Sequence, residues 1–179
     1  MNRFNEFKDI RSVVQTNPCF VGLGNTFRKD DGLGVYIIDS LMNYPVASRI
    51  TFLKAEDIIE SYVFKIAMYD NPTIVLIDAI EPMDTRIEPG SILFGKYTEF
   101  FDTSSSYSTH KLSLQLSCKI LEESDKEVYI LGIVPANVEF GKGFTSEVKE
   151  SSDYLIDTLV AFMSESENVD VIKKEKKYV

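Results

Sequence analysis

Residues 73–80 read TIVLIDAI, the most apolar strand-like stretch of the chain. Its β-branched residues, and its lack of alternation between apolar and polar side chains, are typical of a strand covered on both faces in a parallel sheet. The exception is Asp78. A carboxylate that is buried without a partner destabilises a fold. Asp78 therefore either caps a neighbouring loop or belongs to a functional site.

Outward from this stretch, strand-like runs alternate with segments of helical periodicity. The other predicted strands are 19–24, 50–55, 91–95 and 127–135, and the predicted helices are 31–42, 57–68, 111–123 and 145–165. This alternation predicts an α/β fold, a three-layer α/β/α sandwich around a mostly parallel, twisted sheet of five strands. We expect a single α/β domain at 18–166, an N-terminal arm or short helix at 1–17, and a charged C-terminal tail at 167–179.

The helical periodicity also predicts which residues face the core. They are Val35, Ile38, Leu41 and Met42; Ile59, Tyr62, Val63 and Ile66; and Leu112, Leu116, Cys118 and Ile120. Asp57 and Thr145 are expected to be the N-caps of the second and fourth helices.

The composition excludes several classes of protein. A net charge of −9 argues against nucleic acid as a partner, because phosphate binding needs a basic surface. The chain lacks an apolar run of membrane-spanning length, and its polar start differs from a signal peptide. Two cysteines, Cys19 and Cys118, make no disulfide framework and are expected to be inert core thiols. We expect a cytoplasmic protein without membrane contact.

Three polar residues are predicted to meet at one edge of the sheet. In such folds, ligands bind beyond the carboxyl ends of the strands. Asp31 follows the first strand, Asp78 lies at the end of the central one, and His110, the only histidine, precedes the helix at 111–123. Taken singly, each has an ordinary interpretation as a cap or a loop residue. Together, two carboxylates and an imidazole suit a divalent metal such as nickel or zinc.

The stretch FVGLGNTFRKDDGLGV (20–35) carries the glycines and the acidic pair. Gly22 and Gly24 follow a strand, as in a dinucleotide-binding loop, but the position of the third glycine is Phe27 and the loop would be acidic. A turn that brings the backbone close to a ligand or partner is the remaining interpretation. Only one residue of the acidic pair can cap the helix, so one carboxylate is left to explain. We assign Asp30 to capping or loop ordering and Asp31 to the site, because Asp78 and His110 can reach the same edge of the sheet.

The residues expected to support the site are those of the turn itself. They are Gly22, Gly24, Asn25, Asp30 and Gly32. A serine or cysteine protease triad is unsupported, because the chain has no G-x-S-x-G elbow and its histidine has no nucleophile at a convincing spacing.

The sequence resembles the hydrogenase maturation endopeptidases between about Cys19 and Phe162. The segments that carry the resemblance are GLGNTFRKDDGLGV (22–35), VLIDAIEP (75–82) with EPGSI (88–92), STHKLSL (108–114) and LGIVPANVEFGKGFTSEV (131–148). The segment KAED (54–57) departs from the family, since many members have a Gly-Thr turn after the second strand.

This resemblance implies a three-layer α/β enzyme of the cytoplasm. The family removes a C-terminal extension from the large-subunit precursor of nickel–iron hydrogenases after nickel insertion. Asp31, Asp78 and His110 match the family residues that bind a divalent metal, which stands for the nickel of the precursor. Zinc or cadmium is expected to be able to occupy the site in vitro, and we expect a monomer.

Two other classes of function stay open at this point. One is a nucleotide- or small-molecule-binding α/β module that uses the glycine turn. The other is a non-enzymatic nickel-assembly partner that docks on the hydrogenase subunit, for which the same three ligands would serve.

Overall fold

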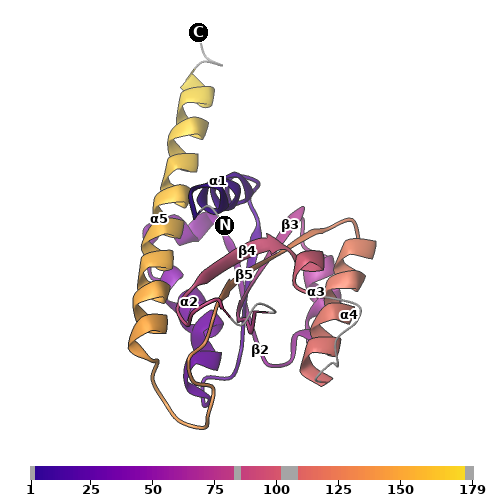
Figure 1. Cartoon of the computed structure of the whole chain (residues 1–179). Helices are drawn as coiled ribbons and strands as arrows, with labels where there is room; N and C mark the ends of the chain where they lie inside the picture. The colour runs from indigo at the N-terminus through magenta and orange to yellow at the C-terminus, as the bar shows by residue number, and fades with distance from the viewer. Residues whose placement is uncertain (1–2, 83–85, 102–108, 176–179) are drawn as a thin grey trace.

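The computed structural model of the protein describes residues 3–82, 86–101 and 109–175, with side chains in 9–82, 86–101 and 112–165. A five-stranded sheet runs through the middle of the molecule in the order β2-β1-β3-β5-β4 (Figure 1). The strands are β1 (Cys19–Leu23), β2 (Thr51–Glu56), β3 (Thr73–Ala79), β4 (Ile92–Lys96) and β5 (Glu127–Ile133). All neighbouring strands are parallel except β4, which is antiparallel to β5. The predicted fold class is confirmed.

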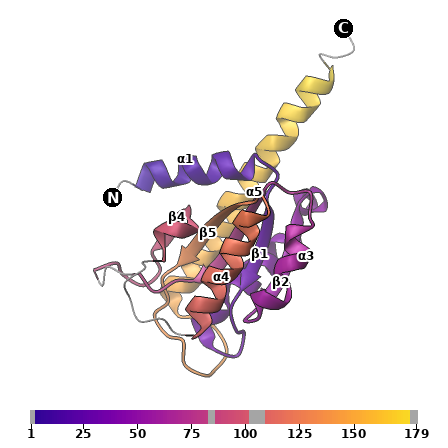
Figure 2. The same ribbon diagram turned by 90° about the vertical axis from the view of Figure 1, so that its right-hand side faces the viewer.

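Helices cover both faces of the sheet (Figures 1 and 2). On one face lie α1 (Arg3–Val14), α2 (Leu33–Leu41) and α5 (Ser146–Glu175), and on the other lie α3 (Val63–Ala67) and α4 (Thr109–Glu123). Short 3-10 helices connect them: η1 (Lys29–Gly32), η2 (Pro45–Arg49), η3 (Ile59–Ser61) and η4 (Tyr97–Glu99).

The central strand β3 divides the core into two clusters. Val75 and Ile77 belong to the cluster that includes buried residues of α1, α2 and α5, whereas Ile74 and Leu76 belong to the cluster on the side of α3 and α4. This division follows from the alternation of side chains along a strand. Asp78 follows Ile74 and Leu76 at the same spacing of two residues, so its side chain lies on the α4 side of the sheet.

Two glycines allow α2 to lie directly on the sheet. A Cβ atom on Gly34 would stand 2.1 Å from the carbonyl oxygen of Ile77, and one on Gly22 would stand 2.5 Å from that of Gly34. Contacts this short exclude any side chain. The backbone approach at Gly22 therefore serves helix–sheet packing within the chain.

The structure corrects several predicted helix details on the two faces. Helix α2 begins at Leu33, after the 3-10 turn that contains both aspartates, and Met42 at its end is exposed rather than inward-facing. The predicted helix at 57–68 is divided into η3 and α3. Asp57 does not cap it and instead accepts a hydrogen bond from the side chain of Asn25, at 3.2 Å.

Helix α4 shows the largest difference from the predicted inward faces. Leu112 and Leu116, predicted to face the core, are 53% and 58% exposed. The helix instead buries Leu114, Cys118 and Leu121. Cys118 is thus inward-facing as predicted, and both cysteines are buried free thiols.

The first and last helices pack together on the α2 side of the sheet. Ile10, Val13 and Val14 of α1 are buried, and α1 lies beside α5, which extends well past the sheet (Figure 1). Helix α5 runs to Glu175, beyond the predicted limit at residue 165. Among the described residues, no helix is long and apolar enough to cross a membrane.

Candidate functional site

Asp78 is the penultimate residue of β3 and lies at the carboxyl edge of the sheet. Its side chain is 5% exposed, and one carboxylate oxygen accepts the backbone N–H of Ala79 at 2.8 Å. Burial and, to a lesser extent, the nearby charge of Asp31 together raise the pKa of Asp78 to about 8. At neutral pH the isolated side chain therefore favours its protonated form.

Asp31 reaches this edge from the turn that follows β1. Its Oδ2 atom accepts the backbone N–H of Asn25 at 2.8 Å. A Cβ atom on Gly24 would stand 1.7 Å from the carbonyl oxygen of Asp31, and Gly24 has a φ of 101°. The backbone before η1 can fold against η1 only with glycine at that position. Gly24 and Asn25 thus hold the aspartate in place.

Asp30 points away from this pair and fastens a second loop. It is fully buried and accepts four hydrogen bonds, from the backbone N–H groups of Ala136, Asn137 and Thr145 and from the Thr145 hydroxyl. The distances lie between 2.7 and 3.0 Å. Asp30 thus orders a loop, which is one of the two roles predicted for it, while the assignment of Asp31 to the site stays a prediction.

The loop between β5 and α5, residues 134–145, also belongs to this region, which was not predicted. The loop leaves the carboxyl end of β5, so the strand-end rule that selected Asp31 and Asp78 also pointed to it. Thr145 directly precedes α5, as predicted, but its hydroxyl donates to Asp30 at 3.0 Å.

Asp31 and Asp78 form a carboxylate pair without a cationic partner among the described residues. No lysine or arginine in that part of the chain forms an ion pair with either side chain. Two carboxylates in a site of low polarity repel one another, and a divalent cation would relieve both the repulsion and the cost of burial. The donor set fits a metal for this reason.

His110, the third predicted ligand, is the second residue of α4. Helix α4 begins at the same edge of the sheet, because its last residue leads through a short turn into the amino end of β5. The His110 side chain lies outside the described part of the structure. Among the described side chains, no group of three His, Cys, Asp or Glu residues forms a metal cluster. Of the three predicted ligands, the structure therefore describes the side chains of Asp31 and Asp78.

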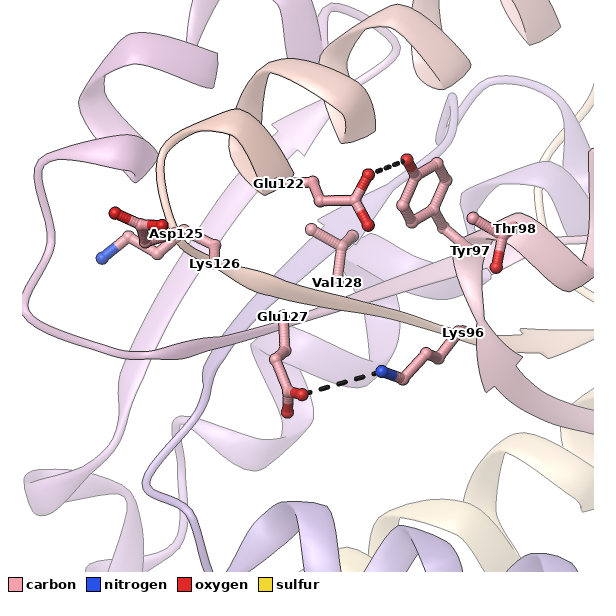
Figure 3. A pocket seen from close by; sticks show the side chains of 8 residues that line it. All are labelled: Lys96, Tyr97, Thr98, Glu122, Asp125, Lys126, Glu127 and Val128. Carbon is pink, nitrogen blue, oxygen red and sulfur yellow. Dashed lines mark hydrogen bonds and ion pairs between the residues drawn. The ribbon is translucent and has the colours of Figure 1, made fainter.

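A hollow of about 200 Å³ lies at the opposite edge of the sheet from the carboxylate pair, where β4 ends and β5 begins (Figure 3). Lys96, Glu122 and Glu127 are among the residues that line it. The Tyr97 hydroxyl donates to Glu122 at 2.6 Å, and the ammonium group of Lys96 lies 3.7 Å from Glu127. These charges pair with one another across an open surface, so this hollow is not the candidate site.

Comparison with known proteins agrees with the resemblance seen in the sequence motifs. The chain is 29% identical over 153 residues to a protein of Methanocaldococcus jannaschii named "Putative hydrogenase maturation protease", and the match covers 81% of this chain and 87% of that protein. A scan against models of protein families finds no match.

Solved structures of hydrogenase maturation proteases have the same fold. The HycI protease of Thermococcus kodakarensis superposes with a TM-score of 0.72 at 22% identity, covering 87% of this chain and 99% of that protein. The HybD endopeptidase of Escherichia coli superposes with a TM-score of 0.69 at 20% identity, covering 84% and 93%.

The fold and the site define a three-layer α/β protein with a carboxylate pair at the carboxyl edge of its sheet. The comparisons confirm the resemblance to the hydrogenase maturation endopeptidases. This chain has their fold and is similar in sequence to a protein named for that activity.

Proposed function

We propose that this protein is an endopeptidase that matures a nickel–iron hydrogenase. Its substrate is the large-subunit precursor, from which it removes a C-terminal extension after nickel has been inserted. Asp31, Asp78 and His110 recognise the nickel that is already seated in the precursor. We place this reaction in the cytoplasm.

The observation that carries the proposal is the Asp31–Asp78 pair in a protein of this fold. Asp78 is buried, its pKa is raised to about 8, and the charge of Asp31 contributes to this rise. Such strongly perturbed carboxyl groups at the carboxyl edge of an α/β sheet are typical of functional sites. The sequence relative and the solved neighbours supply the class of reaction.

The carboxylate pair selects a loaded substrate by electrostatics. Without a cation, the two carboxyl groups disfavour double ionisation, and Asp78 keeps its proton at neutral pH. A precursor that presents a divalent metal favours the ionised form of both groups. Metal at such a site polarises a carbonyl or lowers the pKa of a bound water. A precursor without metal would meet a mismatched, partly protonated site.

The direct test is the intact mass of a purified precursor after incubation with the protein. Nickel-loaded precursor should lose the mass of its C-terminal extension, and nickel-free precursor should keep it. An unchanged mass of the loaded precursor, together with stable binding, would favour a non-enzymatic docking partner. An unchanged mass without binding would exclude both functions.

The nucleotide-binding alternative has no support in the geometry of the glycine turn. Gly22 and Gly24 are occupied by close backbone contacts within the chain. The backbone N–H of Asn25, a group that a phosphate would need, already donates to Asp31. Micromolar binding of a nucleotide at this turn would revive that alternative.

A further inference from the structure

Two loops at the carboxyl edge are joined by a short stretch of parallel backbone pairing. Arg28 and Gly141 form an isolated parallel bridge. The N–H of Gly141 donates to the carbonyl of Phe27 at 2.8 Å, and the N–H of Lys29 donates to the carbonyl of Gly141 at 3.0 Å. We call residues 27–29 together with residues 140–142 the loop ladder. The hydrogen bond from Gly141 to Phe27 brings the backbone of Phe27 against the Phe140–Gly141 peptide.

The loop ladder exposes two aromatic rings. Phe27 is 58% exposed and Phe140 is 83% exposed. The loop between β5 and α5 projects beyond the sheet on the side where α4 begins (Figures 1 and 2). Large exposed aromatic side chains are typical anchors of protein interfaces, where they supply contact area with little loss of conformational entropy.

The same ladder gathers cations in an acidic protein. The chain carries 19 Lys and Arg against 28 Asp and Glu, yet residues 27–29 and 140–142 contribute Arg28, Lys29 and Lys142. Lys29 pairs with Glu139 at 3.3 Å. Arg28 and Lys142 form no ion pair with any described residue. Their charges are available to a negatively charged partner.

The ladder has a fixed position relative to the carboxylate pair. Asp30 follows the first half directly and holds the second loop through its bonds to Ala136, Asn137 and Thr145. Asp31, the next residue, lies close enough to Asp78 for its charge to contribute to the raised pKa of that side chain. A partner held on the ladder would therefore lie beside the site, and its orientation would be set by the same buried aspartate that orders the loop.

We propose that the loop ladder is the docking platform for the protein substrate. The segment that it binds carries a large apolar side chain, which covers the two phenylalanines, and an acidic side chain, which pairs with Arg28 or Lys142. This inference rests on the proposed function, because it names the precursor as the occupant. It assigns Phe27 and Phe140 a role in binding rather than in the cleavage step.

The test compares substrate binding and turnover in two ladder variants with two matched controls. The aromatic variant is Phe27→Ala with Phe140→Ala, and the charge variant is Arg28→Glu with Lys142→Glu. The controls are Phe64→Ala, a ring that is 70% exposed on α3, and Lys65→Glu beside it. The dissociation constant for nickel-loaded precursor, KM and kcat are measured for each after thermal melting has shown that the variant is folded.

The aromatic variant should raise the dissociation constant and KM by about tenfold or more and leave kcat within about twofold. The charge variant should weaken binding most at low salt and reduce the salt dependence of the affinity. Both controls should bind as the wild type does. Unchanged affinity in the folded ladder variants, or an equal loss in Phe64→Ala, would overturn the proposal.

The binding measurement separates this inference from the proposed function. If the wild type binds the precursor but does not cleave it, the dissociation constants alone decide whether the ladder is the docking platform. If the wild type does not bind the precursor, the precursor is not the partner of the loop ladder and the docking proposal is wrong.

Discussion

Asp78 holds a proton more tightly in the folded protein than in the unfolded chain. Its pKa moves from an ordinary value of 3.8 to about 8. A raised carboxyl pKa contributes stability that is complete below pH 4 and is lost as the pH rises toward 8. Ionisation of buried Asp78 therefore opposes folding of the metal-free protein at neutral pH.

Replacing Asp78 by Asn should stabilise the metal-free protein, because the amide cannot ionise. The gain over the wild type should be small near pH 4.5 and grow to about 1 kcal/mol or more at pH 8. Urea denaturation at the two pH values measures it. Asp157→Asn, an exposed site on α5, is the control. A difference that does not depend on pH would contradict the assignment of a raised pKa.

Glu56 occupies a backbone conformation that favours glycine. The φ of Glu56 is 53°. Glu56 belongs to the segment KAED (54–57), where many hydrogenase maturation endopeptidases have a Gly-Thr turn. A non-glycine residue in this region costs about 1 kcal/mol or more. Glu56→Gly should raise the free energy of unfolding by roughly 0.5 kcal/mol once the extra freedom of the unfolded chain is subtracted.

Glu56→Ala is the matched control for this prediction, because alanine keeps the unfavourable φ. Thermal melting of the three proteins compares them directly. Equal melting temperatures for the glycine and alanine variants would show that the turn stores no strain.

Residue types and strand ends predict Asp31 and Asp78 at the same edge of the sheet, and the charge of Asp31 contributes to the raised pKa of Asp78. The buried bonds of Asp30 were not predictable, because they join residues more than a hundred positions apart in the chain. The sequence assigned Asp30 either to helix capping or to loop ordering. That Asp30 orders a loop depends on the fold of residues 134–145, which the sequence around Asp30 does not contain.

At the scale of elements, the loop between β5 and α5 depends on one buried carboxylate. Asp30→Ala would leave three backbone N–H groups without their acceptor. We expect a loss of about 2–4 kcal/mol in the free energy of unfolding and faster hydrogen exchange at Ala136, Asn137 and Thr145. Native exchange rates at these amides would contradict the anchoring role, whatever the change in global stability.

Helix α4 shows why a correct element can have a wrongly predicted face. Its sequence places leucines at 112, 114 and 116, and helical spacing allows either 112 and 116 or 114 to face inward. The first choice places two leucines in the core instead of one, and the prediction followed it for that reason. The sheet selects the second, because Leu114, Cys118 and Leu121 pack against the strands. Periodicity predicts a stripe, while the phase of the stripe depends on tertiary packing.

Across the whole molecule, α1 contributes to the core rather than lying loose. Ile10 is 2% exposed and belongs to the cluster shared with α2 and α5. Ile10→Ala should therefore reduce the free energy of unfolding by about 2–4 kcal/mol. Arg11→Ala, which removes an exposed ion pair with Glu165 at 2.8 Å, should cost less than about 1 kcal/mol. Equal effects in chemical denaturation would contradict the packing of α1.

Both thiols lie inside the molecule and should be unreactive. Burial raises the pKa of Cys19 and of Cys118 to about 12. Reaction with a chromogenic disulfide at pH 8 should be slow in native protein and rapid in denaturant. Rapid labelling of the native protein would place one thiol at the surface.

The layered architecture was the most predictable level. The alternation of strands and helices and the apolar centre of β3 were sufficient for a mostly parallel sheet with helices on both faces. The lengths of α3 and α5 were less predictable, because helix ends depend on what the neighbouring elements cover. The strand-end rule then connected this architecture to a site.

The central claim is that Asp31, Asp78 and His110 together recognise nickel in the precursor. Cleavage of nickel-loaded precursor by the wild type, Asp31→Asn, Asp78→Asn, His110→Ala and the surface control Asp157→Asn, followed by intact mass, tests it directly. The wild type and the control should remove the C-terminal extension, while each of the three site variants should leave the precursor intact at an unchanged fold. Full processing by any one of those three variants would contradict the account.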